Sequence, residues 1–291
     1  MLAEVLRHAS PRSGDVVLDC TLGGGGHALA LLERIMPGGK LIGIDVDPIE
    51  LPRTEARIRD AGYGPASFVA QCGNFTDARA VLDKEQITGV DILIADLGIS
   101  AMQADAGTRG FNYKGVGPLD MRMDPRQGES ASALIASASD TDLAHVLEDH
   151  ADEPYAAIIA QVLKQSDLTT THATERAVRT GLAHAKPELT KAQIKASVRR
   201  TFQALRIAVN DELAALDALL EALPRSLAPG GRAVFITFHS GEDRRVKKAF
   251  QAGQRAGVYS RVAPAITQSS KTETRANRRA MSAKLRWAVK S

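Results

Sequence analysis

At 291 residues the chain can form one large domain or two smaller ones, each with a substantial core. No apolar run approaches the roughly 20 residues that a membrane helix needs, and the polar first segment lacks the apolar middle of a secretory signal. The two cysteines, Cys20 and Cys72, are too few for a disulfide framework, so we expect a reducing cytoplasm.

The modest net charge of +3 hides a strong asymmetry along the chain. From Arg244 onward there are 13 Lys or Arg residues against one acid, Glu273. Such a basic segment is typical of a surface that binds a polyanion, and a solvated, weakly ordered tail is the equal alternative. Charge alone leaves nucleic-acid binding open.

Five apolar segments predict strands, at residues 15–20, 40–45, 66–71, 90–96 and 232–238. Most of them lack polar alternation, as strands buried on both faces do. Helical periodicity follows the first three, at residues 27–36, 50–62 and 75–87. This alternation predicts an α/β fold with a parallel sheet covered by helices on both faces.

The regular spacing breaks after Asp96, because about 135 residues separate it from Arg232, far more than one crossover helix needs. A long helical pattern at 201–223 predicts the true crossover. Residues 105–200 then form an inserted helical domain, with helices predicted at 139–150, 153–164 and 173–185. Ser139 and Asp142 have the spacing of a capping box. The predicted domains are 1–104 with 201–291, and 105–200.

Four glycines follow the first predicted strand, within the stretch DCTLGGGGHALALL at residues 19–32. Gly23, Gly25 and Ala28 match the pattern G-x-G-x-x-[GA], which between a strand and a helix indicates dinucleotide binding. A tight turn that needs positive φ is the alternative. Asp45 lies about 20 residues further on, where a carboxylate can accept both ribose hydroxyls. Together these residues predict nucleoside binding.

Two further acids help to distinguish NAD from S-adenosylmethionine as the ligand. NAD presents a pyrophosphate to the helix N-terminus, whereas S-adenosylmethionine presents a carboxylate and a sulfonium cation. Asp19 and Asp96 stand at the carboxyl ends of predicted strands, where open α/β sheets bind ligands. Either residue alone is commonly a turn or cap residue, but the pair favours the cationic donor.

With these residues identified, the sequence resembles the RsmH (MraW) methyltransferase family over nearly its whole length. The matching blocks are DCTLGGGGH (19–27), GIDVDP (43–48), RGFNYKGVGPLDMRMDP (109–125), RTFQALRIAVNDEL (200–213), ITFHSGEDRRVKKAF (236–250) and SAKLRWA (282–288). The resemblance implies a class I (Rossmann-like) S-adenosylmethionine methyltransferase with an inserted small helical domain for substrate recognition. It also implies methylation of N4 of a cytidine in small-subunit (16S) ribosomal RNA.

The resemblance further implies which residues contact the cofactor. They are Gly25, Gly26, His27, Asp45, Phe75, Asp96 and Gln103. The glycines would admit the methionine moiety to backbone N–H groups, Asp45 would hold the ribose and Phe75 would lie against the adenine. For His27 an ordinary turn residue is the alternative interpretation.

The chain departs from the family's motifs at Ala101, Met102, Ala196, Ser197 and Gly241. The family usually has Ser-Pro, His-Pro and leucine at these places. We expect the changes to spare the cofactor contacts and to fall mostly where the substrate is handled.

Asp96 and His239 are the candidate catalytic residues. A hydrogen-bond acceptor beside the cytosine amine would localise its lone pair, and Asp96 ends the fourth strand, where other amino-methyltransferases carry such a group. His239 would end the fifth strand and line the target pocket. Ser240 and Asp243 have the N-cap and N3 spacing of the following helix. A half-buried strand is predicted near residues 284–289, pairing at the sheet edge.

For two segments of the insertion, the sequence allows both a structural role and a role at the active site. LDMRMD (119–124) puts three charges on one face of an extended segment, either as a self-neutralising strip or as part of the active site. FNYK (111–114) sets two aromatic residues beside a lysine, either to stack a flipped base or to pack a hinge between domains.

The sequence therefore predicts a cytoplasmic rRNA methyltransferase that uses S-adenosylmethionine and no metal. Its expected partner is small-subunit rRNA, and the resemblance implies that this rRNA is part of an assembled particle. No membrane contact is expected, and a homodimer is possible. Two rivals remain. An NAD-dependent oxidoreductase would explain the glycine loop, and a noncatalytic ribosome assembly factor would explain the departures.

Overall fold

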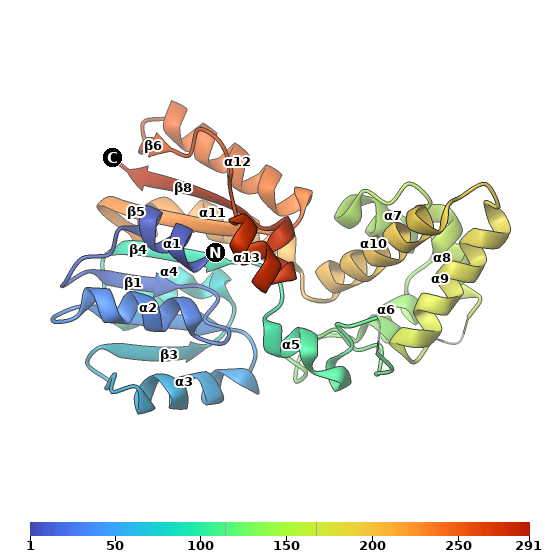
Figure 1. Ribbon diagram of the computed structural model, residues 1–291, viewed down its shortest axis with the longest axis horizontal. Coiled ribbons are helices and arrows are strands. Elements are labelled where there is room, and N and C mark those ends of the chain that lie inside the picture. Colours follow the sequence, from blue (N-terminus) through green and yellow to red (C-terminus); the bar gives the residue numbers. More distant parts are fainter. Residues whose placement is uncertain (114, 167) are drawn as a thin grey trace. The chain divides into compact units, whose positions relative to one another are not determined.

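The computed structural model describes residues 1–113, 115–166 and 168–291, so Lys114 of the FNYK segment lies outside the described residues (Figure 1). Two compact units make up the chain. The sheet unit comprises Met1–Gly98 and Leu213–Ser291, and the helical unit comprises Ile99–Glu212. The described helices include none that is both long and apolar enough to cross a membrane.

The sheet unit is built on a mixed sheet with the strand order β3-β2-β1-β4-β5-β8-β6, and β7 also pairs with β8 (Figure 1). Strands β1 to β5 are mutually parallel, and β8 runs antiparallel to its neighbours. The strands are β1 (Val16–Asp19), β2 (Lys40–Asp45), β3 (Phe68–Cys72), β4 (Val90–Asp96), β5 (Leu227–Thr237), β6 (Tyr259–Val262), β7 (Thr267–Gln268) and β8 (Lys284–Lys290). The predicted α/β, Rossmann-like fold class is confirmed.

The helices of the sheet unit cover both faces of this sheet. They are α1 (Leu2–Ala9), α2 (Gly26–Ile35), α3 (Glu50–Asp60), α4 (Ala78–Lys84), α11 (Glu212–Ser226), α12 (Ser240–Arg255) and the short α13 (Lys271–Ala276), with 3-10 turns at Phe75–Asp77 (η1) and Arg278–Ser282 (η3). Neighbouring strand residues belong to different cores: Val17 packs with α1, α2 and α3, whereas Leu18 packs with α4, α11 and α12. Burial on both faces explains why the strands lack polar alternation.

The helical unit has a hydrophobic core of its own. Its helices are α5 (Ala101–Asp105), α6 (Ala131–Ser137), α7 (Asp140–Ala151), α8 (Ala156–Lys164), α9 (Thr171–Ala185) and α10 (Lys191–Val209), with a 3-10 turn at Gly107–Arg109 (η2). Leu147, Leu163, Leu182 and Leu205 from four of these helices pack in one cluster. Ser139 caps α7 as predicted, since its hydroxyl accepts a hydrogen bond from Asp142 N at 3.1 Å.

The single helix predicted at 201–223 is two helices, α10 and α11, broken at Asn210 and Asp211. Asp211 has φ of 48°, which ends the helical path. The Asn210 side chain is used elsewhere: its Nδ2 donates to Met121 O at 2.8 Å and its Oδ1 accepts from Met123 N at 2.7 Å. The chain consequently leaves the sheet unit at 98 and returns at 213, where 104 and 201 were expected.

The LDMRMD segment is not an extended strand. Arg122 pairs with Asp120 and Arg126 pairs with Asp124, each at 2.8 Å, and the buried Met121 has φ of 64°. The charges thus neutralise one another locally, as the self-neutralising interpretation requires.

Ser197, one of the positions that depart from the family's motif, lies in a buried polar network of the helical unit. Its hydroxyl donates to Glu153 Oε1 at 2.9 Å, and Glu153 Oε2 accepts from Arg200 Nε at 2.7 Å. Both Ser197 and Glu153 are buried. This residue therefore has a structural role in the second unit.

We predict that Ser197→Ala lowers the free energy of unfolding by about 1–3 kcal/mol, because a buried carboxylate loses one of its donors. Denaturant unfolding measures the change. Thr180→Ala, at an exposed position of α9, is the control and should change stability by less than about 0.5 kcal/mol. Equal, small effects of both substitutions would show that the network contributes little.

Candidate functional site

Three acidic residues meet at one edge of the sheet unit. The adjacent parallel strands β2, β1 and β4 end in Asp45, Asp19 and Asp96. Asp19 lies opposite Gly43 of β2 and Ile94 of β4 in the sheet register. All three carboxylates therefore stand at the carboxyl edge, where open α/β sheets bind ligands.

Asp19 is the most deeply buried of the three, with 1% of its surface exposed. Its Oδ1 accepts a hydrogen bond from Thr21 N at 3.1 Å. Burial raises the pKa of Asp19 to about 7, and the nearby charges of Asp96 and Asp45 add to the increase. A cation at this edge would relieve the repulsion and stabilise the ionised carboxylates.

Asp96 offers a hydrogen-bond acceptor that nothing in the described chain uses. Its Oδ1 is buried and has no partner, whereas its backbone N–H donates to Thr21 Oγ1 at 2.6 Å. Burial raises the pKa of Asp96 to about 7, with the N-terminal ammonium acting in the opposite direction and the charge of Glu242 in the same one. Such an oxygen is a natural partner for a donor on a ligand or substrate.

His27, at the start of α2, lies beside this carboxylate. Its Nδ1 is 3.7 Å from Asp96 Oδ2. Burial lowers the pKa of His27 to about 4, so the ring is neutral near pH 7 and the contact is not an ion pair there. The structure thus gives His27 a position at the site and not only in a turn.

The glycine loop leaves room in front of α2. Gly25 has φ of 72°, and a Cβ there would lie 2.9 Å from Thr54 Cγ2, so this position requires glycine. A Cβ at Gly26 would meet no heavy atom within 4 Å. Open space at Gly26 lies beside the first N–H groups of the helix, which have no partner within the helix. An anionic group such as a carboxylate can bind there.

Asp45 holds the loop against the end of β2. Its Oδ2 accepts from Gly23 N at 2.6 Å and its Oδ1 accepts from Asp47 N at 2.9 Å. Burial raises the pKa of Asp45. Each carboxylate oxygen can accept a second hydrogen bond, so both remain available to ribose hydroxyls.

Phe75 and Gln103 occupy different units. Phe75 opens the 3-10 turn after β3 and is half-buried at the edge of the sheet unit's core. Gln103 belongs to the helical unit, where its Oε1 accepts from Ser100 N at 2.9 Å in the capping box of α5. Contact of either side chain with a cofactor stays a prediction.

His239 follows β5 and is the N-cap of α12, so the capping role expected for Ser240 and Asp243 is wrong. Glu242 takes the N3 position: its Oε2 accepts from Phe238 N at 2.7 Å, and its Oε1 lies 3.1 Å from His239 Nε2. Asp243 instead accepts from Arg286 Nε at 2.7 Å. Both His239 and Glu242 are almost fully buried.

Gly241, another departure from the family's motif, lies against the ring of His239. A Cβ at Gly241 would be 3.1 Å from His239 Nδ1. A leucine there would press on the ring, so this change affects a candidate catalytic residue directly.

Sequence reasoning missed Thr21, Thr54 and Glu242 as parts of this edge. Thr54 Oγ1 donates to Gly23 O at 2.6 Å and holds the glycine loop from α3. Thr21 N donates to Asp19 Oδ1, and Thr21 Oγ1 accepts from the backbone N–H of Asp96. The signal for Glu242 is its spacing of three residues from His239, which fits a capping box as well as the spacing of Ser240 and Asp243 does.

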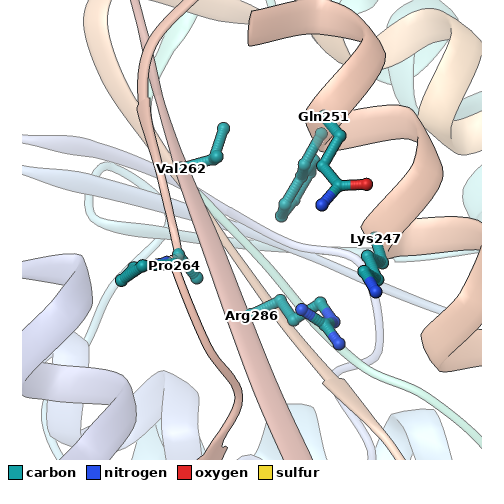
Figure 2. A pocket seen from close by; sticks show the side chains of 7 residues that line it. Lys247, Gln251, Val262, Pro264 and Arg286 are labelled. Atoms are coloured by element: carbon teal, nitrogen blue, oxygen red, sulfur yellow. The ribbon is translucent and has the colours of Figure 1, made fainter.

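The basic end of the chain forms helices and strands of the sheet unit. The strand predicted at 284–289 is β8, but it lies between β5 and β6 and not at the sheet edge. Figure 2 shows a small pocket between α12 and β6–β8, with Lys247 and Arg286 at one end of it. It is lined by Lys247, Phe250, Gln251, Val262, Ala263, Pro264 and Arg286. Lys247, Lys248 and Arg255 of α12 are exposed, so this face is cationic.

The polar groups at the carboxyl edge fit S-adenosylmethionine. The carboxylates suit its cationic centres, the start of α2 suits its carboxylate and Asp45 suits its ribose. The described residues contain no group of three or more His, Cys, Asp or Glu that could hold a metal ion.

The burial of Asp19 makes a prediction about pH and stability. Because its folded-state pKa of about 7 exceeds the ordinary value of 3.8, its contribution to stability is present below pH 4 and is lost as the pH rises through 7. Relative to Asp19→Asn, the wild-type protein should lose up to about 4 kcal/mol of unfolding free energy between pH 4 and 8.

Denaturant unfolding of both proteins across this range measures the effect. Asp60→Asn, at an exposed acid that ends α3, should shift stability by less than about 0.5 kcal/mol throughout. A difference between wild type and Asp19→Asn that does not vary with pH would contradict the burial of a protonated Asp19.

Comparison with known proteins identifies the family. The model of the MraW methylase family matches residues 1–291. "Ribosomal RNA small subunit methyltransferase H 2" of Alkaliphilus metalliredigens is 43% identical over 295 residues, covering 99% of this chain and 83% of the relative. "Ribosomal RNA small subunit methyltransferase H" of Anaeromyxobacter sp. is 41% identical, covering 98% of this chain and 94% of the relative.

These matches span the sheet unit and the helical unit alike, and they decide between the two cofactors that the glycine loop allows. The chain belongs to the MraW methylase family, and S-adenosylmethionine is its methyl donor.

Proposed function

We propose that this methyltransferase methylates small-subunit ribosomal RNA, at N4 of a cytidine. The names of the relatives support the substrate, and the family resemblance supports the methylated atom. The observation that carries the chemistry is the buried Asp96 Oδ1, an acceptor without a partner at the cofactor edge.

The residues of the carboxyl edge would hold the cofactor, which supplies an activated methyl group on a sulfonium when bound. The N–H groups after Gly25 would bind its carboxylate, Asp45 would accept its ribose hydroxyls and Phe75 would pack on its adenine. Asp19 and Asp96 would face its positive charges. Gln103 and His27 complete the set that the resemblance implies.

Asp96 would activate the target amine. The lone pair of cytosine N4 is conjugated with the ring, which makes the amine a weak nucleophile. An N4–H bond donated to Asp96 Oδ1 would localise that lone pair as the new N–C bond forms and the methyl C–S bond breaks. The proton then released from N4 would pass to the same oxygen, whose pKa of about 7 suits a proton acceptor near neutral pH.

His239 would line the target pocket, with Glu242 fixing its ring. The helical unit, Ile99–Glu212, would recognise the RNA, and the basic face of α12 and β8 would bind its phosphates. An assembled small subunit in the cytoplasm would be the substrate.

The direct test uses labelled S-adenosylmethionine and small subunits that lack the modification. After digestion of the RNA, mass spectrometry identifies the labelled nucleoside. Label in N4-methylcytidine is the expected result. Cofactor binding without any label in the RNA would overturn the proposal and favour a noncatalytic assembly factor.

Gly26→Ala should weaken S-adenosylmethionine binding at least tenfold, because the added methyl group enters the open space that the ligand would fill. The free energy of unfolding should change by less than about 1 kcal/mol, since no protein atom lies in the way. Calorimetric titration measures the affinity. Gly64→Ala, where a Cβ also meets nothing, is the matched control. Unchanged affinity in Gly26→Ala would remove the glycine loop from the site.

Asp96→Asn should lower kcat by about 10²–10⁴ while the protein stays folded, because an amide can hold the amine but cannot take its proton. Single-turnover methylation of small subunits at saturating cofactor measures the step. Asp91→Asn, near the other end of β4, should leave kcat within about threefold. A mild loss equal to that of Asp91→Asn would exclude Asp96 as the proton acceptor.

A further inference from the structure

The helical unit carries a row of exposed cations along α10. We propose that Lys191, Lys195 and Arg199 bind the phosphate backbone of the rRNA substrate. The inference rests on the proposed function and adds to it the surface by which the helical unit would engage the RNA.

The three residues lie in one line because they are four residues apart. A helix rises 1.5 Å per residue, so their Cα atoms are spaced about 6 Å apart along the axis. All three side chains are exposed. On the adjoining face of α10, about 60° around the helix, Ile194, Val198 and Phe202 pack into the core of the unit. That packing fixes the rotation of α10 and leaves the row of cations exposed along the border of the buried face.

The charges of this row are not neutralised within the protein. Other arginines of the unit hold a carboxylate: Arg200 pairs with Glu153 and Arg206 pairs with Glu212, both at 2.7 Å, and Arg179 pairs with Glu175. Among the described residues, no carboxylate lies within 4.0 Å of Lys191, Lys195 or Arg199. Like charges four residues apart destabilise a helix, so an external anion would relieve a repulsion already present.

Small side chains lie next to the row on α10. Ala192, which is exposed, and Ala196, which is half-buried, are one turn apart and carry only methyl groups. A bulky polyanion can therefore reach all three cations at once. Ala196 is also one of the departures from the family's motif, which places that change beside the proposed contact.

The arrangement favours a nucleic acid over an acidic protein surface. A row of like charges at equal spacing matches a strand whose charges repeat along its length. The unit does not carry positive charge uniformly, since α7 carries the acids Asp140, Asp142, Glu148 and Asp149. The row on α10 is thus a distinct patch.

The test replaces the three cations together in the full-length protein, as Lys191→Gln, Lys195→Gln and Arg199→Gln. Binding to unmodified small subunits is measured between about 50 and 200 mM salt, with kcat and KM for methyl transfer. We expect the slope of log K against log salt to fall by about 2 to 3, since each phosphate contact contributes nearly one. KM should rise at least tenfold at about 150 mM salt, with kcat and S-adenosylmethionine affinity unchanged.

Two control proteins make the result specific. The first control is a triple variant of the sheet unit that removes three exposed cations from α2 and α3, as Arg34→Gln, Arg53→Gln and Arg57→Gln. It should leave the slope of log K against log salt unchanged. Lys191→Arg with Lys195→Arg keeps the charges and should bind as the wild type does.

A triple variant with the slope and KM of the wild type would overturn the inference and leave the proposed function intact. Weaker binding with an unchanged slope would also overturn it and would indicate a contact with ribosomal protein. Failure of the wild-type protein itself to methylate the subunits would refute the proposed function, a separate outcome.

Discussion

The repulsion between the buried carboxylate of Asp19 and the half-buried carboxylates of Asp45 and Asp96, at one edge of the sheet, is the constraint on which the site depends. Asp19, Asp45 and Asp96 end three neighbouring parallel strands, so the register of the sheet brings their charges together. Burial raises the pKa of all three. A cation at this edge would offset the repulsion among the three carboxylates. S-adenosylmethionine would offer its sulfonium to these carboxylates, its ribose hydroxyls to Asp45 and its own carboxylate to the N–H groups at the start of α2.

The arrangement around these acids follows from the same constraint. Backbone N–H groups of the glycine loop and of Asp47 neutralise part of the charge on Asp45, while Asp96 keeps one oxygen without a partner. A phosphate of NAD would add negative charge to this edge. The electrostatics therefore agree with the family in selecting S-adenosylmethionine.

Much of the sheet unit could be predicted from the sequence because its signals are local. The apolar strands, the glycine loop and the acids that end the strands are all visible as short patterns. Features that depend on distant contacts were not predicted. The break at Asn210 became visible only through its bonds to Met121 and Met123, and the place of β8 inside the sheet depends on pairing across most of the chain. Glu242 was overlooked because a competing cap, Ser240 with Asp243, fits the same spacing.

The departures from the family's motifs also have different physical meanings. Ser197 bonds inside a buried network with Glu153, whereas Gly241 opens space beside His239. One change thus concerns the folding of the helical unit and the other concerns a candidate catalytic side chain. The sequence alone predicts the same role for both positions, in handling the substrate.

The most direct test of the carboxylate edge is a count of the protons released when ligand binds. Calorimetric titrations at about pH 6.5, in buffers of different ionisation enthalpy, would compare S-adenosylmethionine with S-adenosylhomocysteine, which lacks the sulfonium charge. Because Asp19 and Asp96 have pKa values of about 7, the cationic ligand should release on the order of one proton more than the neutral thioether. Equal proton release for the two ligands would contradict a site built to hold a cation among these carboxylates.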